Sequence, residues 1–94
     1  MRYLPLLLLT ACLPTERRVD AAIDEANFCE VAEDCVDVGS VCPFGCNILV
    51  NESEADDITA LLDRFERGRP GMCVYDCAMM LSVSCEENRC VGNY

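Results

Sequence analysis

Cys42-Pro-Phe-Gly-Cys46 and Cys73-Val-Tyr-Asp-Cys77 are two cysteine pairs of equal spacing, and the stretch between them carries the strongest helix signals of the chain. Five further cysteines lie outside this stretch: Cys12, Cys29, Cys35, Cys85 and Cys90. Nine cysteines in 94 residues indicate a disulfide scaffold in an exported chain, and metal binding in a cytosolic one. Because so short a chain buries too little surface to be stable on apolar contacts alone, we expect one small, cross-linked domain.

The charge and composition of the chain argue against several classes of function. Seven Arg and no Lys stand against 17 Asp and Glu, which gives a formal charge of −10. Nucleic acid and anionic surfaces are therefore not expected as electrostatic partners. The chain also has no His, the commonest general base and a common metal ligand. We expect no cofactor and no enzyme activity, although catalysis by carboxylates stays open.

Residues 1–11 have the layout of an export signal. One positive charge, Arg2, precedes a Leu-rich run. This run is far shorter than the roughly 20 apolar residues that a membrane-spanning helix needs.

The next residues, Leu9-Thr10-Ala11-Cys12, resemble the lipobox of bacterial lipoproteins. The resemblance implies that the signal is cut before Cys12 and that lipid on Cys12 anchors the chain in the cell envelope. Two or more acyl chains give a stable anchor, whereas one is marginal. In enterobacterial lipoproteins an Asp directly after this cysteine retains the protein at the inner membrane. Leu13 stands at that position here, so the resemblance implies the outer membrane where the host has one. The alternative is a chance cysteine behind an ordinary signal peptide, but setting Cys12 apart leaves an even number of cysteines.

A tether, residues 12–18, leads into a single domain, residues 19–94. The apolar residues at its start recur with helical spacing: Val19, Ala22, Ile23 and Ala26. This spacing predicts a helix from about Arg18 to about Phe28.

A second helix is predicted from Glu52 to about Arg67. Asn51 and Glu54 form a start that resembles a capping box, and acids crowd the first turn. The apolar stripe consists of Ala55, Ile58, Leu62 and Phe65. Gly68 is expected as a left-handed cap, and Pro70 prevents continuation.

Strands are expected around the helices. The expected segments are 35–38, 47–50, 72–75 and a hairpin over Val83–Val91 with Glu86–Arg89 as its turn. The expected fold is therefore α+β, with two helices (about 18–28 and 52–67) and a small antiparallel sheet.

The eight cysteines after Cys12 are expected to form four disulfides. Eight cysteines can be paired in 105 ways, and the sequence alone does not select one. Because the second helix needs the strands on either side of it as packing partners, at least one bond should join the Cys42/Cys46 turn to the Cys73/Cys77 segment. The other four cysteines would then pair among themselves. Four thiolates from the two central pairs would suit zinc, but an exported chain favours disulfides.

The cysteine layout of residues 29–90 also resembles the small cysteine-rich lipoproteins of unknown function that bacterial genomes encode. That resemblance implies no activity. The favoured function is a binding or structural module of the envelope that meets an envelope protein partner.

The binding residues are open at this point. Pro43-Phe44-Gly45 and Met79-Met80-Leu81 are candidates for an exposed patch, with turn or core positions as the ordinary explanation. A protease-inhibitor-like scaffold is the first alternative, with Arg67-Gly-Arg-Pro-Gly71 as its loop, although a helix cap and exit turn already explain these residues. An enzyme of unknown reaction is the second.

Overall fold

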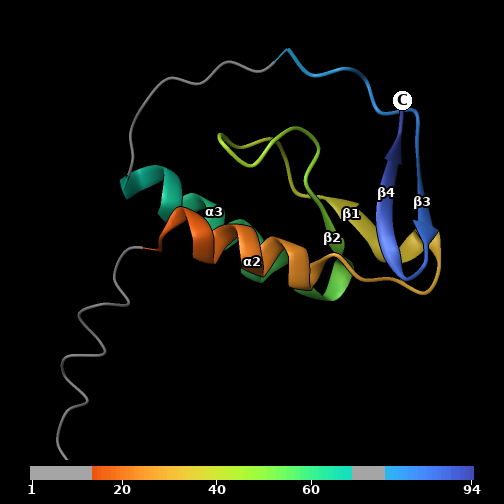
Figure 1. Cartoon of the computed structure of the whole chain (residues 1–94), viewed down its shortest axis with the longest axis horizontal. Helices are drawn as coiled ribbons and strands as arrows, with labels where there is room; N and C mark the ends of the chain where they lie inside the picture. Colours follow the sequence, from red (N-terminus) through yellow and green to blue (C-terminus); the bar gives the residue numbers. More distant parts are fainter. Residues whose placement is uncertain (1–13, 69–75) are drawn as a thin grey trace, which may run out of the picture.

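The computed structural model describes residues 14–68 and 76–94 (Figure 1). In chain order its elements are α2 (Glu16–Ala26), the 3-10 turn η1 (Ala32–Asp34), β1 (Cys35–Asp37), β2 (Leu49–Asn51), the 3-10 turn η2 (Glu52–Glu54), α3 (Ala55–Gly68), β3 (Ser82–Glu86) and β4 (Arg89–Asn93). The predicted α+β class, with two helices and antiparallel strands, is confirmed. No helix within these residues is long and apolar enough to cross a membrane.

Helix α2 begins and ends two residues earlier than predicted. It begins early because the Thr15 side chain accepts a hydrogen bond from the backbone N–H of Arg18 at 3.1 Å, which is the bond of an N-cap. It ends at Ala26 because the side chain of Asn27 bonds outside the helix, to β2 and β4. Val19 and Ala26 are buried, so the predicted apolar face is the packed one.

Helix α3 confirms the second predicted helix, with one difference in its first turn. The Asn51 side chain accepts from the backbone N–H of Ser53 at 2.9 Å, as the predicted cap requires. The turn that follows is 3-10, and α-helical geometry begins only at Ala55. Three residues of the predicted stripe are buried: Ile58, Leu62 and Phe65. The helix runs through Gly68, so Gly68 is its last helical residue and not the cap beyond its end that the sequence predicted.

Strands β1 and β2 pair antiparallel, with Cys35 opposite Asn51 and Asp37 opposite Leu49. The predicted strand 47–50 starts late because Asn47 has a left-handed backbone, with φ of 52°. The predicted strand 72–75 lies outside the described residues.

Strands β3 and β4 form the predicted hairpin with a shorter loop. Glu86 pairs with Arg89, so only Glu87 and Asn88 turn the chain. Their φ values are 53° and 65°, as a type I′ turn requires.

The described residues form two separate two-stranded sheets where the sequence predicted one. Between the two sheets, the side-chain N–H groups of Asn27 donate to the carbonyl oxygens of Leu49 in β2, at 3.0 Å, and Cys90 in β4, at 3.2 Å. A side-chain amide thus joins these two strands, which do not form a ladder with each other.

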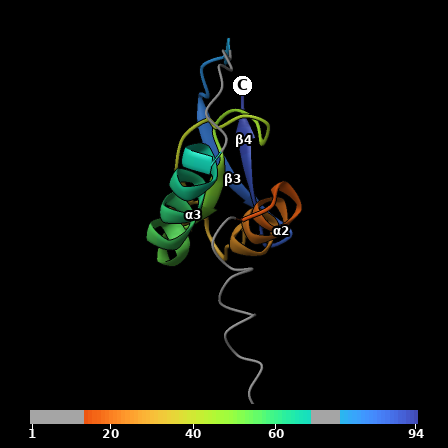
Figure 2. The same ribbon diagram turned by 90° about the vertical axis from the view of Figure 1, so that its left-hand side faces the viewer.

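The main core lies between the two helices and the β1–β2 sheet. Helices α2 and α3 lie side by side and run in opposite directions, as Figures 1 and 2 together show. The buried residues of this core are Val19, Ala26, Val41, Ile48, Val50, Ile58, Leu62 and Phe65. A second, smaller core under the hairpin is formed by Cys29, Leu49 and Cys90.

Candidate interaction surface

Disulfides fix the C-terminal part of the chain onto the rest of the domain. The bonds are Cys29–Cys85, Cys35–Cys90 and Cys46–Cys77. The first two tie the loop after α2 and the start of β1 to the hairpin, and the third joins the turn before β2 to the segment before β3. These are the groupings expected from the sequence.

Of the three remaining cysteines, only Cys42 lies within the described residues. Cys42 is also disulfide-bonded. Cys73 and Cys12 lie outside the described residues, so the fourth disulfide and the lipid attachment stay predictions.

The sulfur atoms of Cys29, Cys35 and Cys90 lie within 4.8 Å of one another. They gather because two disulfides adjoin, not because the fold holds thiolates ready for a metal ion. A metal ion is bound by the deprotonated thiol, which a disulfide sulfur does not offer. Cys46 is bonded to Cys77, so the zinc set considered from the sequence does not exist in this form of the protein.

The first candidate patch, Pro43-Phe44-Gly45, turns its aromatic residue inward. The Phe44 ring meets the buried Phe65 ring edge to face, with centroids 5.0 Å apart. The peptide bond between Cys42 and Pro43 is cis, and Gly45 has a φ of 113°. This segment is therefore a tight turn whose aromatic ring extends the core, which was the ordinary explanation.

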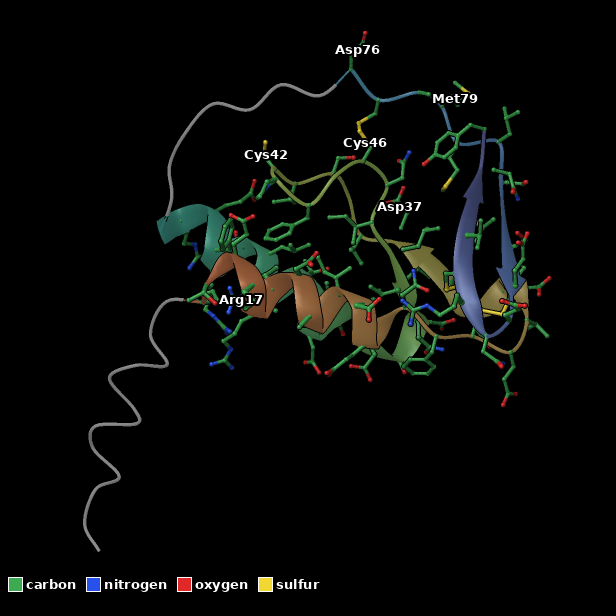
Figure 3. All side chains as sticks on the ribbon, viewed as in Figure 1. Arg17, Asp37, Cys42, Cys46, Asp76 and Met79 are labelled. Atoms are coloured by element: carbon green, nitrogen blue, oxygen red, sulfur yellow. A yellow bond between two sulfur atoms is a disulfide. The ribbon has the colours of Figure 1, made fainter. Side chains whose placement is uncertain are left out.

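The second candidate patch is exposed. Met79 keeps 80% of its surface accessible and Leu81 keeps 73%. Figure 3 shows the Met79 side chain directed away from the body of the domain. We call the outer side of this segment the Met79–Leu81 face.

Met80, between these two residues, has the opposite environment. It is half-buried, and its sulfur covers Gly92 of β4 so closely that a Cβ added there would lie 2.8 Å from it. The backbone N–H of Leu81 donates to the carbonyl of Asn93 at 2.8 Å and so extends the hairpin pairing. The inward contact of Met80 and this bond hold the segment in place, and they leave its two apolar neighbours in solvent.

The Met79–Leu81 face lies far from the start of the domain. In Figure 1 helix α2 begins at the end of the molecule opposite β3 and β4. A chain held at its amino-terminal side would therefore present this face away from the point of attachment.

The loop nominated for protease inhibition is seen only at its beginning. Arg67 and Gly68 belong to the last turn of α3, and the Arg67 guanidinium forms an ion pair with Asp63 one turn earlier. Arg67 is thus a helical residue rather than part of an extended loop. Residues 69–71 lie outside the described residues.

Sequence reasoning missed Asn27 altogether. Besides its two donated bonds, its side-chain oxygen accepts from the backbone N–H of Cys90 at 2.6 Å. The only signal in the sequence was a polar residue directly after the last apolar residue of the helix. Polar residues are common at helix ends, so this signal does not indicate a bond to distant strands.

Comparison with known proteins finds no matching family model, no matching curated protein and no matching solved structure. Any assignment of function therefore rests on the residues and geometry described above.

Proposed function

We propose that this chain is a lipid-anchored binding module of the bacterial cell envelope, held in the membrane through Cys12. The outer membrane is the favoured site where the host has one, because Leu13 follows the cysteine. The observation that carries the binding role is the exposure of Met79 and Leu81 on a segment fixed by a disulfide.

Because Met79 and Leu81 are exposed, their burial does not contribute to the stability of the domain. Full burial of a Met or Leu side chain is worth about 1.5–3 kcal/mol, so a partner that covers the two side chains would gain this free energy for each of them. The Cys46–Cys77 bond lies two residues before Met79 and restricts the segment before any partner arrives. Less ordering is then needed on binding, which favours affinity.

The proposed anchor and the proposed binding face suit each other in position. Three residues lie between Cys12 and Glu16, the first residue of α2, and these four steps along the chain reach at most about 14 Å. Such a tether keeps the α2 end close to the membrane and turns the hairpin end away from it, toward partners in the adjoining compartment.

The binding role is tested with a photo-crosslinking amino acid introduced into the full chain in living cells. At position 79 we expect a covalent adduct of defined mass, and at Thr59, an exposed position on α3, we expect none. Adducts of equal yield at both positions, or none at position 79, would refute the Met79–Leu81 face. An adduct with a protease, together with inhibition that Arg69→Ala abolishes, would favour the inhibitor alternative. Turnover of an envelope substrate would favour the enzyme.

The anchor is tested separately by mass spectrometry of the mature protein. The expected amino-terminal residue is Cys12 carrying diacylglyceryl, and Cys12→Ser should move the protein out of the membrane fraction. An unmodified Cys12, or a mature chain that begins elsewhere, would contradict the lipoprotein assignment.

A further inference from the structure

A groove of about 550 Å³ runs between α2 and α3, on a different surface from the Met79–Leu81 face. This volume lies within the range of ligand-binding clefts. Its apolar lining consists of Ala22, Ala26, Phe28, Ile58, Ala60 and Leu61.

Small side chains line much of the groove. Ala22 and Ala26 lie one turn apart on α2, and Ala60 lies on α3. Methyl groups cannot fill the space between two helices, which larger residues occupy elsewhere in the core. At one end the groove is bounded by Phe28, which is 43% exposed although it is aromatic.

The rim of the groove is acidic near this aromatic residue. Glu25, Glu54 and Asp57 line the groove, against one cation, Arg64. Because the helices are antiparallel, the three acids lie with the end of α2 and the start of α3, and Arg64 lies about two turns further along α3. The ion pairs of the described residues, Arg67 with Asp63 and Arg89 with Asp24, leave these three carboxylates without a cation.

We infer that this groove binds a cationic amphipathic helix of a protein partner. The apolar side chains of the partner helix enter the groove between Ala22 and Ile58, as the apolar face of an amphipathic helix does in other hydrophobic grooves. Its Lys or Arg side chains meet the carboxylates of the acidic end, where the Phe28 ring also attracts a cation. An acidic side chain one or two turns away on the partner meets Arg64.

The charges of the groove select this occupant over other apolar segments. An acidic or neutral helix would gain the same apolar contacts but would leave three carboxylates crowded and unpaired. The net charge of −10 adds attraction for a basic segment at longer range, and salt weakens that attraction.

The inference is tested with the oxidised full chain and a synthetic helical peptide of about four turns, built from Leu and Lys with leucines on one face. Its twin, in which Glu replaces every Lys, is the control probe. Fluorescence anisotropy at low and moderate salt should show binding of the Lys peptide only, weakened by salt. Amide chemical shifts in NMR spectra should change at Ala26, Ile58 and Leu61.

Two matched pairs of variants locate the interaction. Asp57→Lys should weaken binding about tenfold, whereas Asp56→Lys, which changes the net charge equally, should weaken it far less. Both aspartates are exposed in the first turn of α3, but only Asp57 lines the groove. Ala60→Trp should abolish binding by filling the groove, and Thr59→Trp should not.

Several outcomes would overturn the inference. Equal losses for Asp56→Lys and Asp57→Lys would mean that only the overall charge attracts the peptide. Equal affinity for the Glu peptide, or no binding of either, would exclude a cationic helix. Self-association of the chain that Ala60→Trp abolishes would assign the groove to a second copy. None of these results bears on crosslinking at position 79, so the proposed function is judged independently.

Discussion

Replacing Asn27 with Ala should cost the domain about 3 kcal/mol of unfolding free energy. The substitution removes three hydrogen bonds, two donated to the carbonyls of Leu49 and Cys90 and one accepted from the N–H of Cys90. Each such bond contributes about 1 kcal/mol net, and a partly buried backbone group left unpaired adds to the loss. Native domains have about 5–15 kcal/mol in total, so this one side chain supplies a large share.

Urea unfolding of the oxidised protein, followed by far-UV circular dichroism, measures this loss directly. Asn93→Ala is the matched control, because the bonds that its side chain makes to described residues stay within the hairpin, to the hydroxyls of Ser82 and Ser84. We expect about 1 kcal/mol or less for the control. A loss below about 1 kcal/mol for Asn27→Ala would refute the view that this amide holds the two sheets together, as would equal losses for the two variants.

Three further predictions concern the core, the hairpin turn and the cross-links. Phe65→Ala should cost about 3–5 kcal/mol in urea unfolding, and Phe44→Ala clearly less, because Phe65 is 4% exposed whereas Phe44 is only half-buried; equal costs would contradict the packing described. Glu87→Asn should raise the thermal midpoint by the equivalent of about 0.5–1 kcal/mol, since Asn tolerates the φ of 53° better than Glu; a lower midpoint would argue against a type I′ turn. Replacing both Cys46 and Cys77 with Ser should cost about 4 kcal/mol by the chain-entropy model for a separation of 31 residues, and an unchanged urea midpoint would contradict it.

Helix α3 was predictable because every signal for it is local. A cap residue, an acidic first turn and an apolar stripe all lie within its own residues, and such signals do not depend on what the helix later contacts. The hairpin was predicted with too long a turn for the opposite reason. Glu87 and Asn88 are an unusual pair for a type I′ turn, and this turn is supported by residue 29, to which Asn88 is joined through two hydrogen bonds of 3.0 and 3.1 Å. Contacts between residues so distant in the chain leave no local pattern.

Of the two candidate surfaces, the sequence indicated one and not the other. Met79 and Leu81 were recognised from an apolar run, but only the position of Met80 over Gly92 shows which side of the run faces solvent. The groove between α2 and α3 had no signal in the sequence, because Ala22 and Ala26 were assigned to the packed apolar face of their helix. Glu54 and Asp57 were assigned to the positive end of the α3 dipole, which is still their role toward that helix, and Glu25 was assigned to the solvated surface.

The disulfide arrangement also sets the order in which the protein can mature. The three bonds whose two cysteines are both described span 56, 55 and 31 residues, whereas closer candidates lie 4 to 6 residues apart, such as Cys42 with Cys46 or Cys29 with Cys35. In a chain oxidised as it emerges amino terminus first, Cys29 and Cys35 meet each other long before Cys85 and Cys90 exist. Closing a short loop also costs less entropy than closing a long one. Early bonds therefore tend to be the wrong ones, and the native set is reached by thiol attack on them. Completion of the native set therefore depends on the hairpin cysteines Cys85 and Cys90, which follow their partners by 56 and 55 residues.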